Sequence, residues 1–112
     1  MRDRRTSNAD LAELVYVSDS GIHGRGLFAT RRIARGEYIG TFSGPPAKRN
    51  GSHVLWVYAE DGESVEGRRG RNLLRFVNHA VPCNAAFEGF DLYSVRAIPR
   101  DAEITIDYGW AE

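Results

Sequence analysis

Two short polar clusters near the C-terminal end of this 112-residue sequence carry side chains that could do chemistry. The first is Asn78-His79, the second is Asp107-Tyr108, and each follows a largely apolar stretch. A plain core strand would alternate or stay apolar, so these clusters are unusual for purely structural segments. Together they place an amide, an imidazole, a carboxylate and a phenol at the ends of short expected strands. Such a set could bind a polar ligand and orient a reacting group.

A pair of glycines, Gly24 and Gly26, flanks Arg25 between two expected strands. Glycine lets a backbone approach a ligand closely, because no Cβ stands in the way. The alternative for this pair is a tight turn or a bulge. Asn78 and His79 also have two interpretations. The amide can bind a ligand or cap a turn, and the imidazole can be a structural one in the core.

Three segments, taken in order, resemble the signatures of the SET-domain protein lysine methyltransferases. Residues 24–29 are similar to that family's GxGLFA motif, residues 75–84 to RFxNHxxxPN, and residues 103–109 to ELTxDYG. The resemblance covers about residues 15–110. It implies a mostly β fold, a SET-domain β-clip of short strands and small sheets with a knot-like C-terminal segment. It also implies transfer of a methyl group from S-adenosyl-L-methionine to a lysine amine of a protein substrate.

The resemblance assigns roles to individual positions. Those it places at the cofactor are Gly24, Arg25, Gly26, Asn78 and His79, with Trp110 as a candidate lid. Those that resemble the walls of the lysine channel are Phe42, Phe87 and Ile106.

Tyr108 is the expected catalytic residue. Methyl transfer from a sulfonium needs a neutral amine, and a lysine pKa near 10.4 makes that form cost roughly 4 kcal/mol at physiological pH. Burial in an apolar channel beside a positive sulfonium lowers the pKa of the amine. The Tyr108 hydroxyl would then orient the amine for attack. The structural alternative is a core tyrosine near a chain end.

Several positions depart from the family pattern. Phe42 stands where a tyrosine is usual, and Val81 stands where many members have a zinc-ligating cysteine. Cys83 replaces the proline of the PN pair, so we expect an altered local turn. Only residues 45–52 remain for the insert that usually forms one wall of the peptide groove. Cofactor binding is therefore better supported than peptide recognition.

A metal site is not expected. Cys83 is the sole cysteine, and His79 with Cys83 would need two further ligands for zinc. A Cys83–His79 nucleophilic pair lacks an orienting third residue.

Composition sets the remaining expectations. Hydrophobic residues make up 42% and charged residues 27% of the chain, as in ordinary globular proteins. The 15 basic and 15 acidic residues cancel, so a nucleic-acid partner is not favoured. No apolar run approaches the roughly 20 residues that span a bilayer, and the start is polar. We therefore expect a cytoplasmic protein with no membrane partner, a flexible N-terminal arm over residues 1–10 and a single domain over 11–112.

The expected elements are mostly strands. Stretches rich in β-branched and aromatic residues lie at 14–17, 26–30, 38–43, 54–58, 91–96 and 103–108, and residues 72–76 fit one helical turn. Residues 27–35 also align with residues 92–100, which predicts two copies of one strand–turn–strand unit; the alternative is chance similarity of two hairpins.

Two rivals to the enzyme remain open. One is a non-catalytic SET-fold module that binds cofactor or peptide, and the other is a small β scaffold without a cofactor. A symmetric homodimer would cover Trp56 and Trp110 if they are partly exposed. The sequence does not name the protein substrate.

Overall fold

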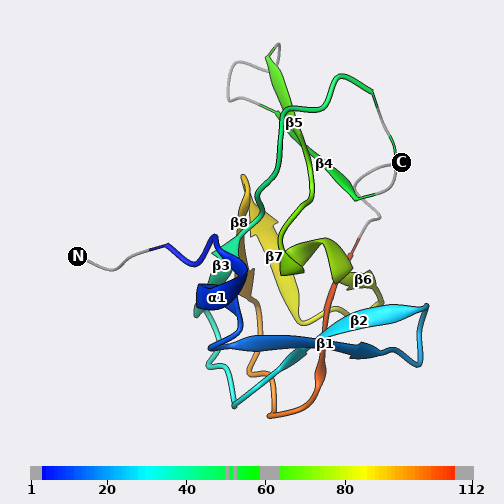
Figure 1. Ribbon diagram of the computed structural model, residues 1–112. Coiled ribbons are helices and arrows are strands. Elements are labelled where there is room, and N and C mark those ends of the chain that lie inside the picture. The colour runs from blue at the N-terminus through cyan, green and yellow to red at the C-terminus, as the bar shows by residue number, and fades with distance from the viewer. Residues whose placement is uncertain (1–3, 50, 52, 59–63, 108–112) are drawn as a thin grey trace.

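The computed structural model describes residues 4–49, 51, 53–58 and 64–107 (Figure 1). It confirms a mostly β fold of short elements. The helical ones are α1 (Asn8–Leu11) and the 3-10 helix η1 (Leu73–Phe76). The strands are β1 (Val15–Asp19), β2 (Arg25–Ala29), β3 (Tyr38–Thr41), β4 (Val54–Tyr58), β5 (Val65–Arg69), β6 (Asn78–His79), β7 (Ala85–Glu88), β8 (Asp91–Ser94) and β9 (Glu103–Ile106).

The strands form three small sheets, with the orders β1-β2-β9-β6, β3-β8-β7 and β4-β5. All neighbours are antiparallel except β6 and β9, which run parallel. Strand β9 therefore lies between two earlier parts of the chain, β2 and β6, in the knot-like arrangement expected for the C-terminal segment. The β4-β5 hairpin stands at one end of the molecule (Figure 1).

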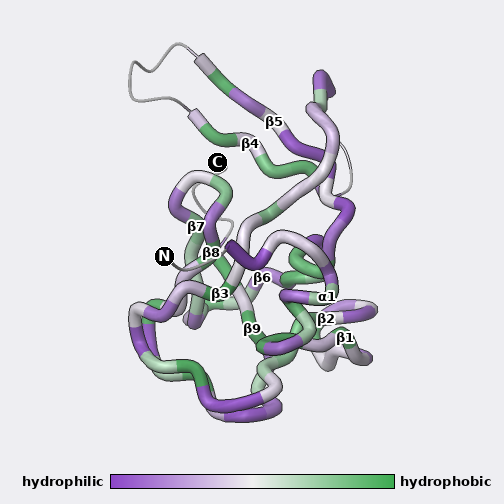
Figure 2. Tube along the Cα trace, turned by 60° about the vertical axis from the view of Figure 1, so that its left-hand side comes forward, coloured by the Kyte–Doolittle hydropathy of each residue, from purple (hydrophilic) through white to green (hydrophobic). Residues whose placement is uncertain are grey.

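The core is built from aliphatic side chains that alternate along these short strands. Leu27, Ile39, Leu92 and Ile104 are fully buried, and Leu74 reaches the same cluster from η1. Figure 2 shows the hydrophobic stretches along the strands and strongly hydrophilic ones in several connecting turns. In β8 the burial alternates, so a slip of one residue would expose the side chains that the strand buries.

The internal repeat predicted from the sequence is present as a pseudo-twofold pairing. In the first copy β2 leads to β3, in the second β8 leads to β9, and β2 pairs with β9 while β3 pairs with β8. Ile33 and Ile98, 65 positions apart, form the bridge between the two connecting turns. Each donates its N–H to the other's carbonyl at 2.8 Å. Each strand of one copy therefore pairs with a strand of the other copy, and the bridge joins the two connecting turns.

The two turns also share a left-handed residue. Gly36 has φ of 81° and Asp101, again 65 positions later, has φ of 67°. The N–H of Gly36 donates to the carbonyl of Ser94, and the N–H of Asp101 donates to that of Ala29, in matching places. Glycine adopts this backbone conformation without steric cost, whereas Asp101 adopts it against a preference.

Residues 4–10 do not form the free arm that the sequence predicted. The carbonyl of Arg5 accepts from the N–H of Thr41 at 2.9 Å, and the guanidinium of Arg4 pairs with Asp91. Ser7 caps α1 by accepting from the N–H of Asp10. Polar composition suggested mobility, but it could not show that these backbone groups complete the open edge of β3. Residues 1–3 lie outside the described residues.

Candidate functional site

Asn78 lies on β6, and its side-chain amide is hydrogen-bonded to the backbone of the glycine loop. The Nδ2 atom lies 3.1 Å from the carbonyl of His23 and 3.2 Å from that of Arg25. It also lies 3.2 Å from Ser20 Oγ and 2.9 Å from Glu103 Oε2. The four atoms around Nδ2 are all hydrogen-bond acceptors. The amide must therefore point its NH2 group at them, because the flipped amide would place its oxygen against their lone pairs. The structure therefore brings residues 24–26 and Asn78 together, as their motifs predicted.

We call Ser20, Asn78 and Glu103 the Asn78 cluster. The Ser20 hydroxyl donates to the Glu103 carboxylate at 2.8 Å, and the Ser20 N–H donates to the carbonyl of Gly24 at 2.8 Å. The hydrogen bonds that the Asn78 side chain makes with the described residues all run from Nδ2, and none of them uses Oδ1. That oxygen can accept from a cationic group of a ligand.

Glycine is required at the two loop positions for different structural reasons, lack of space at one and backbone conformation at the other. A Cβ on Gly26 would lie 2.2 Å from Glu103 Oε2, so this position must stay bare for the cluster to close. A Cβ on Gly24 would meet nothing within 4 Å, but Gly24 has φ of 48°. Gly24 thus fits the turn interpretation, and Gly26 makes room for a carboxylate. Glu103 was not expected in the site, although its place at the start of the last motif was a usable signal.

His79 is not a buried structural imidazole. Its Nδ1 atom lies 3.8 Å from Asp107 Oδ1, and the two side chains are 41% and 49% exposed. Both residues are at the end of the β6–β9 pair, where the N–H of Ala80 donates to the carbonyl of Ile106 at 3.1 Å.

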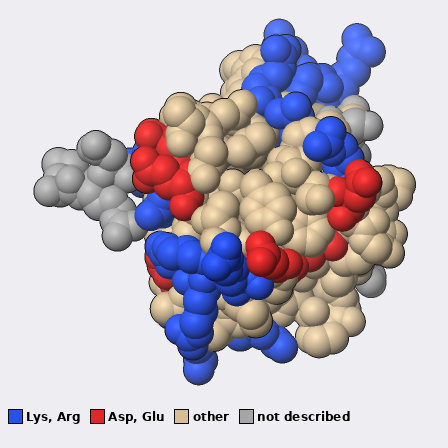
Figure 3. Space-filling model, turned by 60° about the horizontal axis from the view of Figure 1, so that its bottom comes forward, with Lys and Arg blue, Asp and Glu red and all other residues tan. Residues whose placement is uncertain are grey.

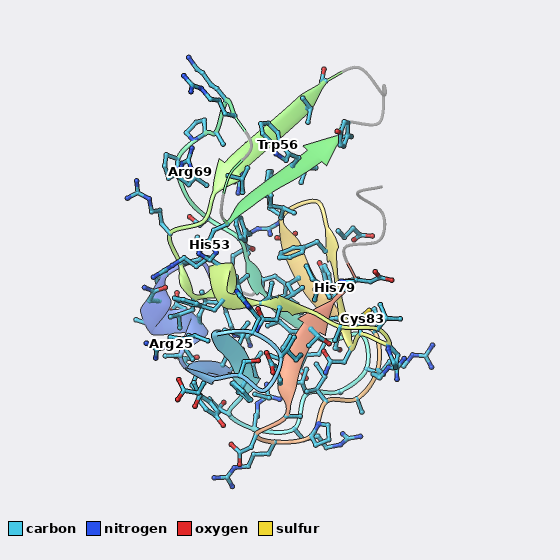
Figure 4. All side chains as sticks on the ribbon, turned by 90° about the vertical axis from the view of Figure 1, so that its right-hand side faces the viewer. Arg25, His53, Trp56, Arg69, His79 and Cys83 are labelled. Atoms are coloured by element: carbon cyan, nitrogen blue, oxygen red, sulfur yellow. The ribbon has the colours of Figure 1, made fainter. Side chains whose placement is uncertain are left out.

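An apolar pocket of about 260 Å³ lies between the β4-β5 hairpin and the strands β7 and β9. It is lined by Leu55, Trp56, Tyr58, Cys83, Ala85, Ala86, Phe87, Gly89, Ile106 and Asp107. Trp56 of the hairpin and Cys83 can be located in Figure 4. The lining is long and mostly hydrocarbon, which suits an extended aliphatic side chain.

The predicted channel residues are divided between the pocket wall and the layer behind it. Phe87 and Ile106 line the pocket, as expected. Phe42 is 4% exposed and packs edge-to-face against Phe87, with the ring centroids 5.9 Å apart, so it supports the wall. Trp56 lies across Gly67 of β5, whose Cβ would come within 2.5 Å of its ring. No local spacing in the sequence connects Trp56 or Cys83 to this pocket.

Strand β9 connects the two parts of the site. Glu103 at its start belongs to the Asn78 cluster and Ile106 at its end lines the pocket, roughly 10 Å further along an extended strand. Asn84 fixes this strand by pairing with its backbone twice. Its Nδ2 donates to the carbonyl of Glu103 at 2.8 Å, and its Oδ1 accepts from the N–H of Thr105 at 2.8 Å.

Tyr108 and Trp110, the expected catalytic residue and lid, lie outside the described residues. Asp107, next to Tyr108 in sequence, lines the apolar pocket. Within the described ranges, no three His, Cys, Asp or Glu side chains gather in a way that could hold a metal ion. No helix in the described part of the chain is long and apolar enough to cross a membrane.

Comparison with known proteins agrees with this geometry. The chain is 30% identical over 116 residues to human histone-lysine N-methyltransferase 2B, and 26% identical over 124 residues to histone-lysine N-methyltransferase trithorax of Drosophila virilis. These alignments include 86% and 93% of this chain but only 4% and 3% of the relatives, so the chain spans a small part of their length.

Two solved structures show the same fold. One is ctPRC2 in an autoinhibited conformation bound to S-adenosylmethionine, with a TM-score of 0.71 and 21% identity over 86% of this chain and 15% of that one. The other is the methyltransferase domain of human histone-lysine N-methyltransferase SETMAR, with a TM-score of 0.72 and 17% identity over 84% of this chain and 44% of that one. The family model for the SET domain matches residues 24–109, well over half of the sequence. The chain belongs to the SET-domain family.

Proposed function

We propose that this chain transfers a methyl group from S-adenosyl-L-methionine to a lysine side-chain amine of a protein. The observation that carries the proposal is the arrangement along β9. A polar cluster stands at one end of the strand and an apolar pocket at the other. The first suits the charged end of the cofactor, and the second suits the hydrocarbon part of a lysine. The names of the two curated relatives and the cofactor of the ctPRC2 structure support the same assignment.

The Asn78 cluster fits the amino-acid part of S-adenosylmethionine. A zwitterion needs an acceptor for its ammonium and donors for its carboxylate. Asn78 Oδ1 is such an acceptor, and backbone N–H groups of residues 24–26 and His79 are candidate donors. When bound, the cofactor supplies an electrophilic methyl group on a sulfonium. The role of this chain is to hold the zwitterionic end and to exclude water nearby.

The apolar pocket fits the substrate amine. Phe87, Ile106 and Trp56 would surround the aliphatic stem, and burial would lower the pKa of the amine because it penalises the ammonium form. Asp107 also lines the pocket, with its Oδ1 atom 3.8 Å from His79 Nδ1. We propose that the hydroxyl of Tyr108, which follows Asp107 in the chain, orients the neutral amine.

A labelled-methyl assay tests this function. The protein is incubated with methyl-labelled S-adenosylmethionine and a lysate of the source organism, and labelled bands are identified. Wild type should label at least one protein on lysine, and Tyr108→Phe should label it at least tenfold more slowly, because the orienting hydroxyl is lost. Cofactor affinity of the variant should stay within about twofold. Labelling that persists unchanged in Tyr108→Phe would remove Tyr108 from the mechanism, and no labelling at all would contradict the enzyme.

The second candidate is a SET-fold module that binds cofactor or peptide without turnover. Phe42 in place of the usual tyrosine favours it, as does the short insert of residues 45–52, which falls between β3 and β4. Saturable binding of S-adenosylmethionine without methyl transfer to any protein of the lysate would support this module. Transfer at a measurable rate would exclude it.

A further inference from the structure

The end of the molecule opposite the hairpin carries a concentration of arginines. The two turns of the repeat lie there, at the bottom of Figure 1. Their exposed basic side chains, which we call the arginine end, are Arg31, Arg32, Arg35, Arg96 and Arg100. Figure 3 brings this end forward and shows a group of basic side chains in the lower part of the view, with acidic ones beside it.

The arginine end is attached to a rigid frame. The Ile33–Ile98 bridge joins the two turns by two hydrogen bonds of 2.8 Å, and both isoleucines are fully buried. Each of the five arginines is at most two residues from this bridge, which is roughly 7 Å along an extended chain. The guanidinium groups therefore start from neighbouring, fixed backbone positions.

Most of this charge is not neutralised by the protein itself. The guanidinium groups of Arg32, Arg35 and Arg96 make no hydrogen bond or ion pair with another described residue, although the backbone carbonyl of Arg32 accepts from Arg31 at 2.8 Å. Arg31 pairs with Glu37 at 2.7 Å, whereas Arg100 lies 3.8 Å from Asp101 in an exposed pair. Exposed pairs of this kind contribute little and leave the cation accessible. The two turns, residues 31–37 and 95–101, thus carry five arginines against Glu37 and Asp101, in a chain whose formal net charge is zero.

We propose that the arginine end binds the phosphate backbone of double-stranded nucleic acid. Guanidinium groups match phosphate oxygens in a two-point geometry, and phosphate contacts require little besides such cations. The pairs Arg31/Arg96 and Arg35/Arg100 are each 65 positions apart, so they are related by the pseudo-twofold axis of the repeat. The two antiparallel strands of a duplex are related by twofold axes as well. The zero net charge had argued against nucleic acid, and the uneven placement of the charge revises that expectation.

The surroundings of the arginines favour this partner over an acidic protein or a single strand. Protein interfaces are anchored by aromatic and large apolar side chains, and single-stranded nucleic acid is held by stacking on aromatic rings. In the described parts of both turns, Val95 is the one large hydrophobic side chain that is exposed, and no aromatic residue lies at 31–36 or 95–101. The turns themselves thus present mainly arginines, with Glu37 and Asp101 beside them and the exposed hydroxyl of Tyr16 bonded to Asp101.

The test is fluorescence anisotropy with a labelled, random-sequence DNA duplex of about 20 base pairs, measured over a range of salt. The variant is Arg32→Ala/Arg35→Ala/Arg96→Ala, whose side chains have no described hydrogen-bond partners. The control is Lys48→Ala/Arg49→Ala/Arg71→Ala, which removes three exposed charges elsewhere. We expect saturable binding by wild type and at least tenfold weaker binding by the variant. The log–log salt slope should be lower by roughly three in the variant, since three phosphate contacts are lost.

Three results would support the proposal together: retained affinity in the control, partial rescue by Arg→Lys at the same three positions, and an unchanged thermal unfolding midpoint. Absence of saturable binding by wild type would overturn it. So would an equal loss of affinity in the control, which would show that charge alone matters. A polyglutamate peptide that displaces the duplex at equal or lower charge concentration would assign the surface to an acidic protein instead. None of these outcomes depends on methyl transfer.

Discussion

Strands β3 and β9 occupy equivalent places in the repeat, yet their outer edges are covered by different parts of the chain. The edge of β3 is completed by the N-terminal segment, through the bond from the N–H of Thr41 to the carbonyl of Arg5. The edge of β9 is completed by β6, the short strand that carries Asn78 and His79. An asparagine fastens each cover. Asn72 donates to the carbonyls of Thr6 and Thr41, and Asn78 donates to the glycine loop.

The difference lies in what each cover leaves open. Asn72 and Thr41 are 5% and 8% exposed, so the β3 edge is closed to solvent. At the β9 edge, the side chains of His79 and Asp107 are 41% and 49% exposed. The two halves of the repeat therefore share one fold and differ in the segment that covers the strand edge. In our proposal, only the edge covered by β6 binds a ligand. Paired substitutions in the two halves test this separation.

The largest expected effect is on stability, from Asn72→Ala. The substitution leaves the buried carbonyl of Thr41 and the half-buried carbonyl of Thr6 without their donor, at a cost of about 3 kcal/mol in the free energy of unfolding. Removal of Asn72 Oδ1, which is buried without a partner among the described residues, offsets a small part of that cost. Urea unfolding measures the change. Cofactor affinity of the folded variant, measured well below its unfolding midpoint, should match wild type, and a parallel loss would show that the two edges are coupled.

Asn78→Ala should have the opposite profile. Its acceptors His23 and Arg25 are at the surface, where water can replace the amide, so the free energy of unfolding should fall by less than about 1 kcal/mol. Cofactor affinity should fall about thirtyfold, which corresponds to roughly 2 kcal/mol for the lost acceptor and the loosened loop. Calorimetry decides between this role and simple capping, for which affinity would not change.

The left-handed turn residues allow a smaller comparison of the two copies. Asp101→Gly should raise the free energy of unfolding by about 1 kcal/mol, because glycine relieves the cost of φ at 67°. The exposed bond from Tyr16 to Asp101, at 2.9 Å, is lost at little cost. Gly36→Asp at the equivalent position should lower stability by a similar amount. Thermal unfolding of both variants checks the pair, and changes of the same sign would refute the equivalence of the turns.

The smallest expected effect is a pH dependence of the N-terminal cover. Burial disfavours ionisation of Asp91, but the hydrogen bonds from Arg4 and Thr41 outweigh it and lower the pKa of this carboxyl. Because the folded-state pKa is below the ordinary value near 3.8, the stabilisation is present above that pH and is lost as the pH falls through the folded-state pKa. Unfolding midpoints of wild type and Asp91→Asn should therefore converge between about pH 4 and pH 2. A constant difference over this range would show that Asp91 does not titrate against its partners.

The sequence predicted the parts of the structure that are encoded locally. Alternating segments marked β2, β4, β8 and β9, and three motifs placed the glycine loop beside Asn78. Strand β5 was not predicted, because Val65–Arg69 is mostly charged and becomes a strand by pairing with β4. Glu103 in the cluster and Trp56 at the pocket were missed for a related reason. Their places depend on contacts between segments far apart in the chain, which no local spacing encodes.

The most direct test of the account is a titration of isotope-labelled protein with S-adenosylmethionine, followed by two-dimensional amide NMR. If the β9 edge holds the cofactor, the signals of Gly24, Gly26, Asn78 and His79 should shift and saturate together. The signals of Arg5, Thr6 and Thr41 at the matching β3 edge should stay unchanged. Absence of any saturable shift, or shifts confined to the β3 edge, would contradict the assignment of this site to the cofactor.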